Sequence, residues 1–423
     1  MVKNRTYILF LLRFIVVLAI LPQVEAADPK QPEGRIADQD LQRRMERISA
    51  LPYAGGNYLV PPKDGILVYN RELAYAGLNI YIDNHAPKAY LMDMEGKVLH
   101  HWEADLQELW PDGIPDGGVL WRRVRLFDNG DLLAIFDEGS HWLVKLDKDS
   151  NILWTYKERS CHHDLDVDEN GNIYVLTMEA IAEHKKLDLS PGPILVDFIT
   201  ILNPQGEEIE NISLLECFLN SNYDSVMINA RLDCRDEGDI FHTNTLELLD
   251  GRIVDKAPMF TKGHILISMR NQDAIAIVDP EERKVTWMMW GMWKIQHEPT
   301  VLDNGNLLLF DNGGISENIK RWSKVIEFNP LTQEVVWAYR GDLDNNFYSQ
   351  ACGTNQRLAN GNTLITDSKR GRAFEVTPEN KIVWEFITPN QIIYWGKECS
   401  ATLFDLIRIE PSRLSFLSRP EKD

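Results

Sequence analysis

The sequence predicts an all-β protein, a six-bladed β-propeller whose last blade is closed by N- and C-terminal strands. Two alternating repeat units support this fold class. In one unit a strand, a turn and a second strand end in tryptophan, and its five clear copies end at Trp102, Trp154, Trp287, Trp337 and Trp384. The other unit is a hairpin around an Asn-Gly or Asp-Gly turn, the dipeptides that type I′ turns favour.

The spacing of the repeats gives the number of blades. Neighbouring tryptophans lie 52, 50 and 47 residues apart, with a double step where a degenerate copy, DFITILNPQGEEIENI, fills 197–212. Two hairpins per step make one four-stranded blade, and five such pairs follow one another from Val119 to Trp384. One tryptophan unit at about 78–102 and the C-terminal strands at about 400–410 are left over. Joining them yields a sixth blade and removes the exposed sheet edges.

The N-terminus is typical of a secretory signal peptide. Lys3 and Arg5 precede a short apolar run, YILFLLRFIVVLAIL, and Val24-Glu25-Ala26 offers small residues for cleavage. We therefore expect a periplasmic or secreted protein, with an uncleaved N-terminal membrane anchor as the alternative. The regions expected along the chain are a signal peptide (1–26), a lead-in (27–64) with a short helix at 37–50, the catalytic propeller (65–412) and a polar tail (413–423).

Charge and cysteine content narrow the classes of partner. The formal net charge is −20, and loss of the signal segment, with three basic residues and one acidic residue, brings it to −22 (−20 − 2). Such a field repels phosphate backbones, so we expect no nucleic-acid partner. The five cysteines include no CxxC pair. Cys217 and Cys234 close the shortest loop, so they are the preferred candidates for a disulfide in an exported protein.

Three histidines occupy one position of the hairpin repeat. His163 and His297 lie eight residues before the turn glycine of their hairpins, and His242 lies nine before its own. Arg122 and Gly353 hold the equivalent position in the other two hairpins. The inner strands of a propeller all face one axial channel, so equivalent positions converge on one small volume. A single histidine at a strand start is commonly a surface residue, but three in one repeat position favour a functional cluster.

Two further side chains indicate which chemistry this cluster suits. Arg270 follows on the next strand of the His242 blade, and Asn244 lies two residues after His242, on the same strand face. Three histidines can hold a metal ion, but a nearby arginine repels a cation and suits an anionic group in transfer. Asp164 and Glu298 would face away from the histidines if strand alternation holds, so we expect no metal site. The alternatives are that Arg270 pairs with Glu298 and that Asn244 closes a turn.

The repeat motifs resemble those of the bacterial PAPS-independent arylsulfate sulfotransferase family. The resemblance runs from about residue 65 to 400 and rests on HHDLDVDENGNIYVL, HTNTLELLDG, HILISMRNQDAIAIVD, QHEPTVLDNGNLLLFDNG and RLANGNTLITDSKRGRAFEVTPENKIVWEF. It implies a six-bladed propeller enzyme that moves a sulfuryl group from an aryl sulfate to a phenol. These two small molecules would be its partners, and no cofactor is implied.

The same resemblance implies a role for each matching residue. His297, of the Gln-His motif, would attack the sulfur and carry a transient sulfohistidine. His242 and Arg270 would bind the sulfuryl oxygens, with support from Asn244. His163, of the His-Asp motif, would stabilise the phenolic oxygen as it leaves or attacks.

Some assignments stay open at this point. Either His162 or His163 faces the channel, and the His-Asp pattern of the family favours His163. Trp290 and Trp293 are candidates for the walls around an aryl group, with core packing as the alternative. Only about forty residues precede the propeller, where the family has an N-terminal β-sandwich that contributes to dimerisation, so a homodimer is left open.

Two other functions remain to be separated from sulfuryl transfer. A metal-dependent oxygenase or hydrolase would use the same histidines as metal ligands. A non-catalytic propeller would use them for binding alone. Metal analysis of the purified protein tests the first alternative, and an inactive protein without affinity for anions would indicate the second.

Overall fold

The computed structural model describes residues 61, 63–115, 119–137, 141–185, 192–225, 238–313, 322–341, 347–394 and 396–417. All of them belong to one compact unit, Leu41–Asp423. The expected signal peptide, the helix expected at 37–50 and Cys234 lie outside the described residues. Within the described ranges, no helix combines the length and the apolar character needed to cross a membrane.

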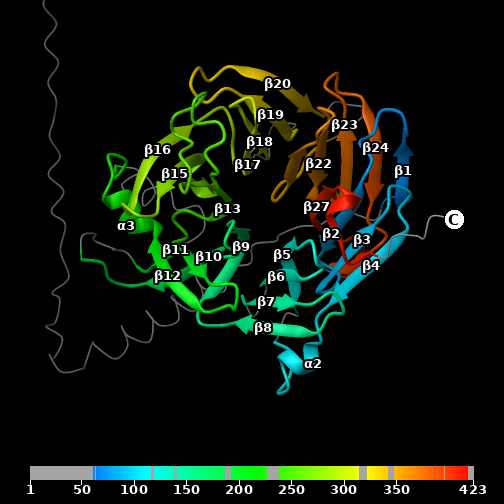
Figure 1. Ribbon diagram of the computed structural model, residues 1–423, viewed down its shortest axis with the longest axis horizontal. Helices are drawn as coiled ribbons and strands as arrows, with labels where there is room; N and C mark the ends of the chain where they lie inside the picture. The colour runs from blue at the N-terminus through cyan, green and yellow to red at the C-terminus, as the bar shows by residue number, and fades with distance from the viewer. Residues whose placement is uncertain are drawn as a thin grey trace, which may run out of the picture. The chain divides into compact units, whose positions relative to one another are not determined.

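Six antiparallel sheets stand around a central axis as the blades of a propeller, which confirms the predicted fold (Figure 1). Each of the first four blades consists of four consecutive strands, from the axis outward. They are blade 1 with β5 (Leu120–Leu126), β6 (Leu132–Asp137), β7 (Leu143–Leu146) and β8 (Ile152–Tyr156); blade 2 with β9 (Ser160–Val167), β10 (Ile173–Ile181), β11 (Ile194–Leu202) and β12 (Glu208–Ser213); blade 3 with β13 (Thr243–Leu248), β14 (Ile265–Met269), β15 (Ala274–Asp279) and β16 (Lys284–Trp290); and blade 4 with β17 (His297–Val301), β18 (Leu307–Asp311), β19 (Lys324–Phe328) and β20 (Val335–Arg340).

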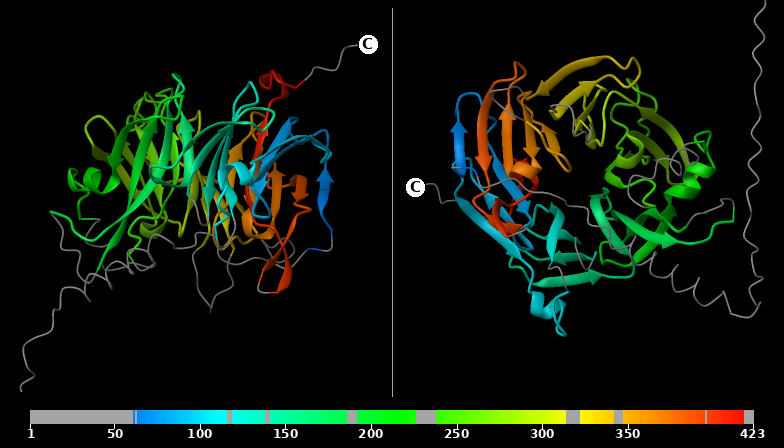
Figure 2. Two further views of the ribbon diagram at one scale, coloured as in Figure 1. Left: turned by 90° about the horizontal axis from the view of Figure 1, so that it is seen from below. Right: turned by 180° about the vertical axis from the view of Figure 1, so that it is seen from behind.

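The last two blades join segments from both ends of the described chain (Figure 2). Blade 6 has the C-terminal strand nearest the axis, and β27 pairs with β2 so that Leu78 lies opposite Ile409. This pairing confirms the predicted closure. Blade 5 carries β1 as a fifth, outer strand, which the repeats did not predict. The strands are, for blade 5, β21 (Thr354–Arg357), β22 (Thr363–Asp367), β23 (Arg372–Val376), β24 (Ile382–Ile387) and β1 (Gly65–Tyr69), and for blade 6, β27 (Leu403–Ile409), β2 (Leu78–Asp83), β3 (Lys88–Met92) and β4 (Val98–Glu103).

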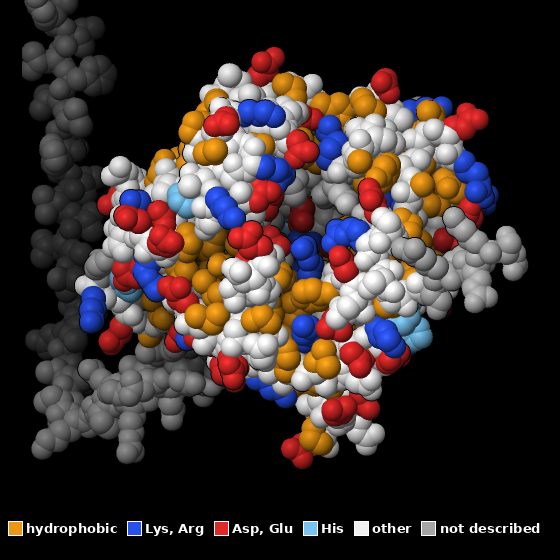
Figure 3. Space-filling view, in the orientation of Figure 1, with side chains coloured by type: hydrophobic (Ala, Val, Ile, Leu, Met, Phe, Trp, Pro, Cys, Tyr) orange, Lys and Arg blue, Asp and Glu red, His pale blue; other side chains and the backbone are white. Residues whose placement is uncertain are grey.

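The remaining elements are short. They are α2 (Leu106–Leu109), α3 (Leu214–Leu219), the 3-10 turns η1 (Arg270–Gln272), η2 (Ser368–Arg370) and η3 (Pro411–Arg413), and the hairpin of β25 (Gln391–Tyr394) and β26 (Lys397–Ser400). Cys217, on α3, is a buried free thiol. The face of the ring drawn in Figure 3 is hollowed near its centre, where Lys and Arg side chains gather.

The repeat tryptophans connect neighbouring blades at four of the six junctions between the described blades. Four of them lie on the fourth strand of their blade and donate the indole N–H to a backbone carbonyl in a turn of the following blade. The pairs are Trp102 with Gly130 (2.9 Å), Trp154 with Pro204 (3.2 Å), Trp337 with Pro378 (2.9 Å) and Trp384 with Met94 (3.0 Å). At these four junctions, the tryptophan that identified the blade from sequence also hydrogen-bonds that blade to the next one.

The chain after β27 differs from the polar tail expected there. Leu414 is buried, and the Ser415 N–H donates to the Asp128 carbonyl at 2.9 Å. Phe416 packs on Trp102, with ring centroids 5.8 Å apart. The apolar side chains draw residues 414–417 onto blades 1 and 6, so this part of the expected tail belongs to the packed propeller.

Candidate active site

The first residues of several inner strands meet in a pocket at the propeller axis, which we call the histidine pocket. Its lining comes from blades 1 to 6 and combines basic, imidazole, amide and thiol groups. The lining residues are Arg122, Arg123, His163, Asn244, His297, Glu298, Cys352, Gly353, Thr354 and Phe404. Equivalent repeat positions, far apart in sequence, thus converge in space.

The inner strands present these side chains because they are bulged near their first residues. The pairing register shifts at Arg122 in β5, between Cys161 and Leu165 in β9, at Asn244 in β13, and between His297 and Thr300 in β17. A bulge bends the strand and redirects the side chains next to it. His163 and His242 have φ values of 51° and 50°. Non-glycine residues rarely adopt such values, which cost about 1–3 kcal/mol and are common at active sites.

Two acceptors fix the ring of His297. Its Nδ1 lies 2.8 Å from Asn312 Oδ1 and 3.1 Å from the Ile295 carbonyl oxygen. The Asn312 amide nitrogen donates to the carbonyls of Ser349 and Cys352, so Oδ1 is the atom that faces the histidine. The ring hydrogen is therefore on Nδ1, and Nε2 carries the lone pair.

The histidines of the pocket are held neutral. Burial lowers the pKa of His297 well below 6.5, and the positive charges of Arg122 and Arg270 lower it further, against the opposing effect of the Asn312 hydrogen bond. Burial and the charge of Arg122 likewise lower the pKa of His163. A neutral imidazole with a defined lone pair can act as a nucleophile.

His242 and His162 flank His163. The ring centroids of His163 and His242 are 4.9 Å apart, and the Nδ1 atoms of His162 and His163 are 2.9 Å apart. His242 Nδ1 lies 2.6 Å from Asp239 Oδ2, and Asp239 Oδ1 accepts the His242 backbone N–H at 2.9 Å. This carboxylate keeps a hydrogen on Nδ1 and stabilises positive charge on the His242 ring. His162 Nε2 lies 3.6 Å from Asp197 Oδ1, and burial lowers the pKa of His162 to about 3.

Arg270 and Asn244 belong to blade 3. Asn244 lines the histidine pocket, whereas Arg270 and His242 are not among its lining residues; the charge of Arg270 nevertheless lowers the pKa of His297. Arg270 begins η1 directly after β14, and its backbone N–H donates to the His242 carbonyl at 3.2 Å. Its Nη1 donates to Asn271 Oδ1 at 2.9 Å. Asn244 donates from Nδ2 to the Gln296 carbonyl at 2.8 Å, so it also holds the residue before His297.

Arg123 joins three carboxylates from three other blades, a group we call the Arg123 cluster. Its Nε lies 2.7 Å from Asp164 Oδ1, its Nη2 lies 2.6 Å from Glu298 Oε2, and its Nη1 lies 2.8 Å from Asp405 Oδ2. Asp164 and Glu298 therefore turn toward the axis, and the expectation that they face away was wrong because the bulges break strand alternation. Glu298 binds Arg123, so the alternative pairing with Arg270 is also wrong.

Neither tryptophan expected as an aryl wall lines the histidine pocket. Trp293 is buried, donates from Nε1 to the Asp273 carbonyl at 2.9 Å, and packs on Phe328 with ring centroids 5.3 Å apart. Trp290 ends β16, the outermost strand of blade 3, and is 49% exposed. Trp293 thus serves core packing, the alternative weighed from sequence. Among the lining residues, the aromatic ring is that of Phe404.

Three residues of the site escaped the sequence reasoning. Asn312 is the first residue after the second strand of blade 4, and Arg270 holds the same position in blade 3. Comparing the ends of the second strands would have found it. Asp239 precedes His242 by three residues, an Asp-x-x-His spacing that was not used. Arg122 shares the histidine position of the repeat but was not included in the expected site.

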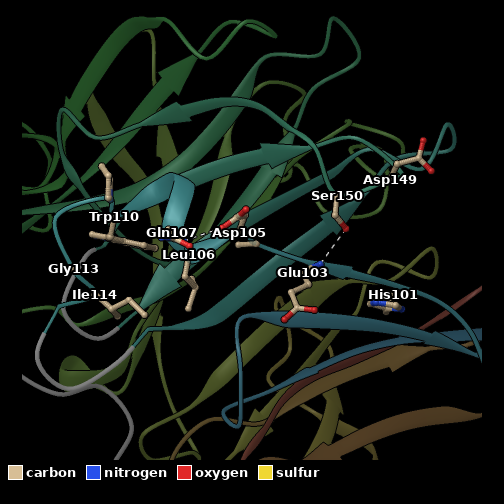
Figure 4. Close-up of a pocket in the computed structure, with 12 residues that line it drawn as sticks. His101, Glu103, Asp105, Leu106, Gln107, Trp110, Gly113, Ile114, Asp149 and Ser150 are labelled. Atoms are coloured by element: carbon tan, nitrogen blue, oxygen red, sulfur yellow. Dashed lines mark hydrogen bonds between the residues drawn. The ribbon is translucent and has the colours of Figure 1, made fainter.

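A wider pocket lies away from the axis, between β4, α2 and the turn from β7 to β8 (Figure 4). Its acidic groups already have structural partners. Glu103 pairs with Lys88 at 2.7 Å, and Asp105 caps α2 by accepting the Gln107 N–H at 2.9 Å. None of the expected site residues lines it, so we assign the chemistry to the histidine pocket. In the described part of the chain, no three His, Cys, Asp or Glu side chains are arranged to share a metal ion.

The family comparison bears directly on the residues described above. Residues 123–389 match the family model of arylsulfotransferase (ASST), and the match spans more than half of the chain. The chain belongs to the arylsulfotransferase family. The matched range contains His163, His242, Arg270 and His297, and the resemblance inferred from the repeat motifs is confirmed. This membership supports arylsulfotransferase activity in general terms.

Comparisons with other proteins add the fold and no activity. No curated protein matches the chain. Among solved structures, a protein of unknown function from Bacteroides caccae is 12% identical, with a TM-score of 0.50, over 78% of this chain and 98% of that one. A streptogramin B lyase is 14% identical, with a TM-score of 0.42, over 79% and 87%. A virginiamycin B lyase from Staphylococcus aureus is 11% identical, with a TM-score of 0.40, over 78% and 90%.

Proposed function

We propose that this arylsulfotransferase family member moves a sulfuryl group from an aryl sulfate ester to a phenol through a sulfohistidine at His297. One observation carries the proposal. The hydrogen bonds from Nδ1 to Asn312 and to the Ile295 carbonyl leave the lone pair on Nε2 of a buried, neutral ring. This is the state that a nucleophilic imidazole needs.

In the first half-reaction, Nε2 attacks the sulfur and an N–S bond forms. The S–O bond to the aryl oxygen breaks, and the aryl group leaves as a phenolate with the electron pair of that bond. The hydrogen on Nδ1 stays in place, because Asn312 Oδ1 and the Ile295 carbonyl stabilise the positive charge that develops on the His297 ring.

The neighbouring side chains stabilise the negative charge on the sulfuryl group and on the phenolic oxygen during this step. Arg270, His242 and Asn244 bind the sulfuryl oxygens, and Asp239 supports positive charge on His242. His163 stabilises the phenolic oxygen. In the second half-reaction the acceptor phenol attacks the sulfur, its proton passes through His163 to solvent, and the N–S electrons return to Nε2.

Activity with p-nitrophenyl sulfate and a phenol acceptor, in the presence of a metal chelator, tests the proposal. We expect wild-type transfer without added cofactor, and a loss of at least about a thousandfold in kcat for His297→Ala. His101→Ala, at an exposed histidine on β4, is the matched control and should keep full activity. Full turnover by His297→Ala, or activity that requires a metal ion, would refute the proposal.

A further inference from the structure

Two consecutive arginines on β5 are buried in opposite charge surroundings. Arg123 has a carboxylate oxygen from each of three residues within 2.8 Å, in the Arg123 cluster. For Arg122, the one ion pair within the described ranges runs from Nε to Asp137 Oδ2 at 4.0 Å, which is beyond hydrogen-bond length. The Arg122 side chain is only 6% exposed. Burial acts to lower the pKa of Arg122, but Cys352 and Asp137 raise it above its ordinary value, although no carboxylate hydrogen-bonds the guanidinium within the described ranges.

The Arg122 guanidinium belongs to the histidine pocket. It is held by the Phe404 ring, whose centroid lies 4.8 Å from Cζ, and by a hydrogen bond from Nη1 to Cys352 Sγ at 3.1 Å. Arg122 lines the pocket together with His163 and His297, and its charge lowers the pKa of both histidines. Burying a cation beside neutral imidazoles is costly unless an anion joins them.

We propose that Arg122 is a second cationic ligand of the sulfuryl group, which it binds from blade 1 while Arg270 binds from blade 3. The inference rests on the proposed function and adds a substrate contact to it. A planar guanidinium can donate to two oxygens of one anionic group at once. Cations from two blades stabilise charge on the sulfuryl oxygens while the N–S bond forms and the S–O bond breaks.

The competing partner for the Arg122 charge is the Cys352 thiol. Burial acts to raise the pKa of this thiol, but the charges of Arg122 and Lys369 bring it below the ordinary value. A thiolate would neutralise Arg122 and repel a sulfate ester. Removing the thiol sulfur of Cys352 therefore distinguishes a role of Arg122 exerted through this thiolate from a role exerted on the substrate. Cys352→Ser would abolish a role exerted through the thiolate, and it leaves a role exerted on the substrate intact.

The test combines calorimetric binding of inorganic sulfate with kinetics on p-nitrophenyl sulfate. Arg122→Met should weaken the Kd for sulfate by about 10- to 100-fold, the value of one or two charge-assisted hydrogen bonds, and lower kcat/KM as much. Arg122→Lys keeps the positive charge but lacks the planar guanidinium that can donate to two oxygens at once. Its sulfate Kd and its kcat/KM should therefore lie between those of Arg122→Met and wild type. Cys352→Ser should lose less of both quantities than Arg122→Met, and Arg125→Met, at a 48% exposed arginine on the same strand, should leave both unchanged.

Stability distinguishes this role from a structural one. Arg122→Met should lose less stability in urea than Arg123→Met, because Arg122 has one carboxylate at 4.0 Å whereas Arg123 has three within 2.8 Å. An Arg122→Met chain that does not fold, an unchanged sulfate affinity, or a Cys352→Ser variant with the same loss would each overturn the inference. Sulfate binding that depends on Arg122 in a protein without transfer activity would refute the proposed function alone.

Discussion

Replacing Arg123 by methionine removes the one cation that the Arg123 cluster shares among Asp164, Glu298 and Asp405. The three carboxylate oxygens lie 2.6–2.8 Å from the guanidinium, on blades 2, 4 and 6. Removing one partner of a single buried ion pair costs about 3–5 kcal/mol, because the other charge remains buried. With three acids left behind, we expect a loss of at least about 3–5 kcal/mol, from a total of about 5–15 kcal/mol.

The loss should depend on pH in a defined direction. Burial raises the pKa of Glu298 to about 7, and burial also raises the pKa of Asp164, while Arg123 opposes both shifts. Without Arg123 these carboxyl groups hold their protons to still higher pH in the folded state. The folded chain then binds more protons than the unfolded chain, so stability falls as pH rises. The gap between Arg123→Met and wild type should therefore widen from about pH 5 to about pH 8.

Urea unfolding followed by tryptophan fluorescence measures the free energy of unfolding at about pH 5 and at about pH 8. Arg125→Met is the matched control on the same strand, since Arg125 is 48% exposed and lies 3.7 Å from Asp166 Oδ1. It should change stability by less than about 1 kcal/mol. An Arg123→Met chain as stable as wild type at high pH, or a loss of stability independent of pH, would refute the reasoning.

Further predictions concern His297, the proposed nucleophile, and the tryptophan contacts. The donor kcat/KM should stay constant as pH falls through 6.5, because the pKa of His297 lies well below that value; an acid limb near 6.5 would contradict a buried neutral nucleophile. Asn312→Leu should lower kcat by at least about tenfold without abolishing it, since the Ile295 carbonyl still orders the tautomer; equal kcat would exclude this role. Trp384→Phe should cost about 1–3 kcal/mol in urea unfolding, and Trp337→Phe less, because Trp337 is more exposed; equal losses would argue against the burial effect.

Much of the fold could be predicted from sequence because each hairpin is specified locally. Asn-Gly turns and strand alternation define the hairpins, and the repeat tryptophans set the blade length. The closure of blade 6 followed from the units left over at the two ends. The outer strand β1 could not be found this way, because GILVY at 65–69 carries neither repeat signal and owes its position to pairing with β24.

The site was predictable where it follows the repeat and unpredictable where the backbone departs from it. His163, His242 and His297 share one repeat position, so the channel geometry brings them close to one another. The Arg123 cluster was missed because bulges turn Asp164 and Glu298 toward the axis, and strand alternation gives no sign of a bulge.

Other residues of the protein are positioned by tertiary contacts alone. Asn312 stands in an Asp-Asn-Gly sequence that has the composition of an ordinary turn, and its hydrogen bond to His297 spans fifteen residues. Trp293 was an equal candidate for the site and for the core until its packing on Phe328 was known. Such residues are decided by tertiary contacts, which residue type and spacing do not encode.

Mass spectrometry of the protein after brief incubation with p-nitrophenyl sulfate, without an acceptor, tests the central claim most directly. The account predicts an added mass of one SO3 group on the peptide that contains His297, and its loss when a phenol is supplied. The adduct should be absent from His297→Ala. An adduct on a different residue, or transfer of the sulfuryl group without any adduct, would contradict a sulfohistidine at His297.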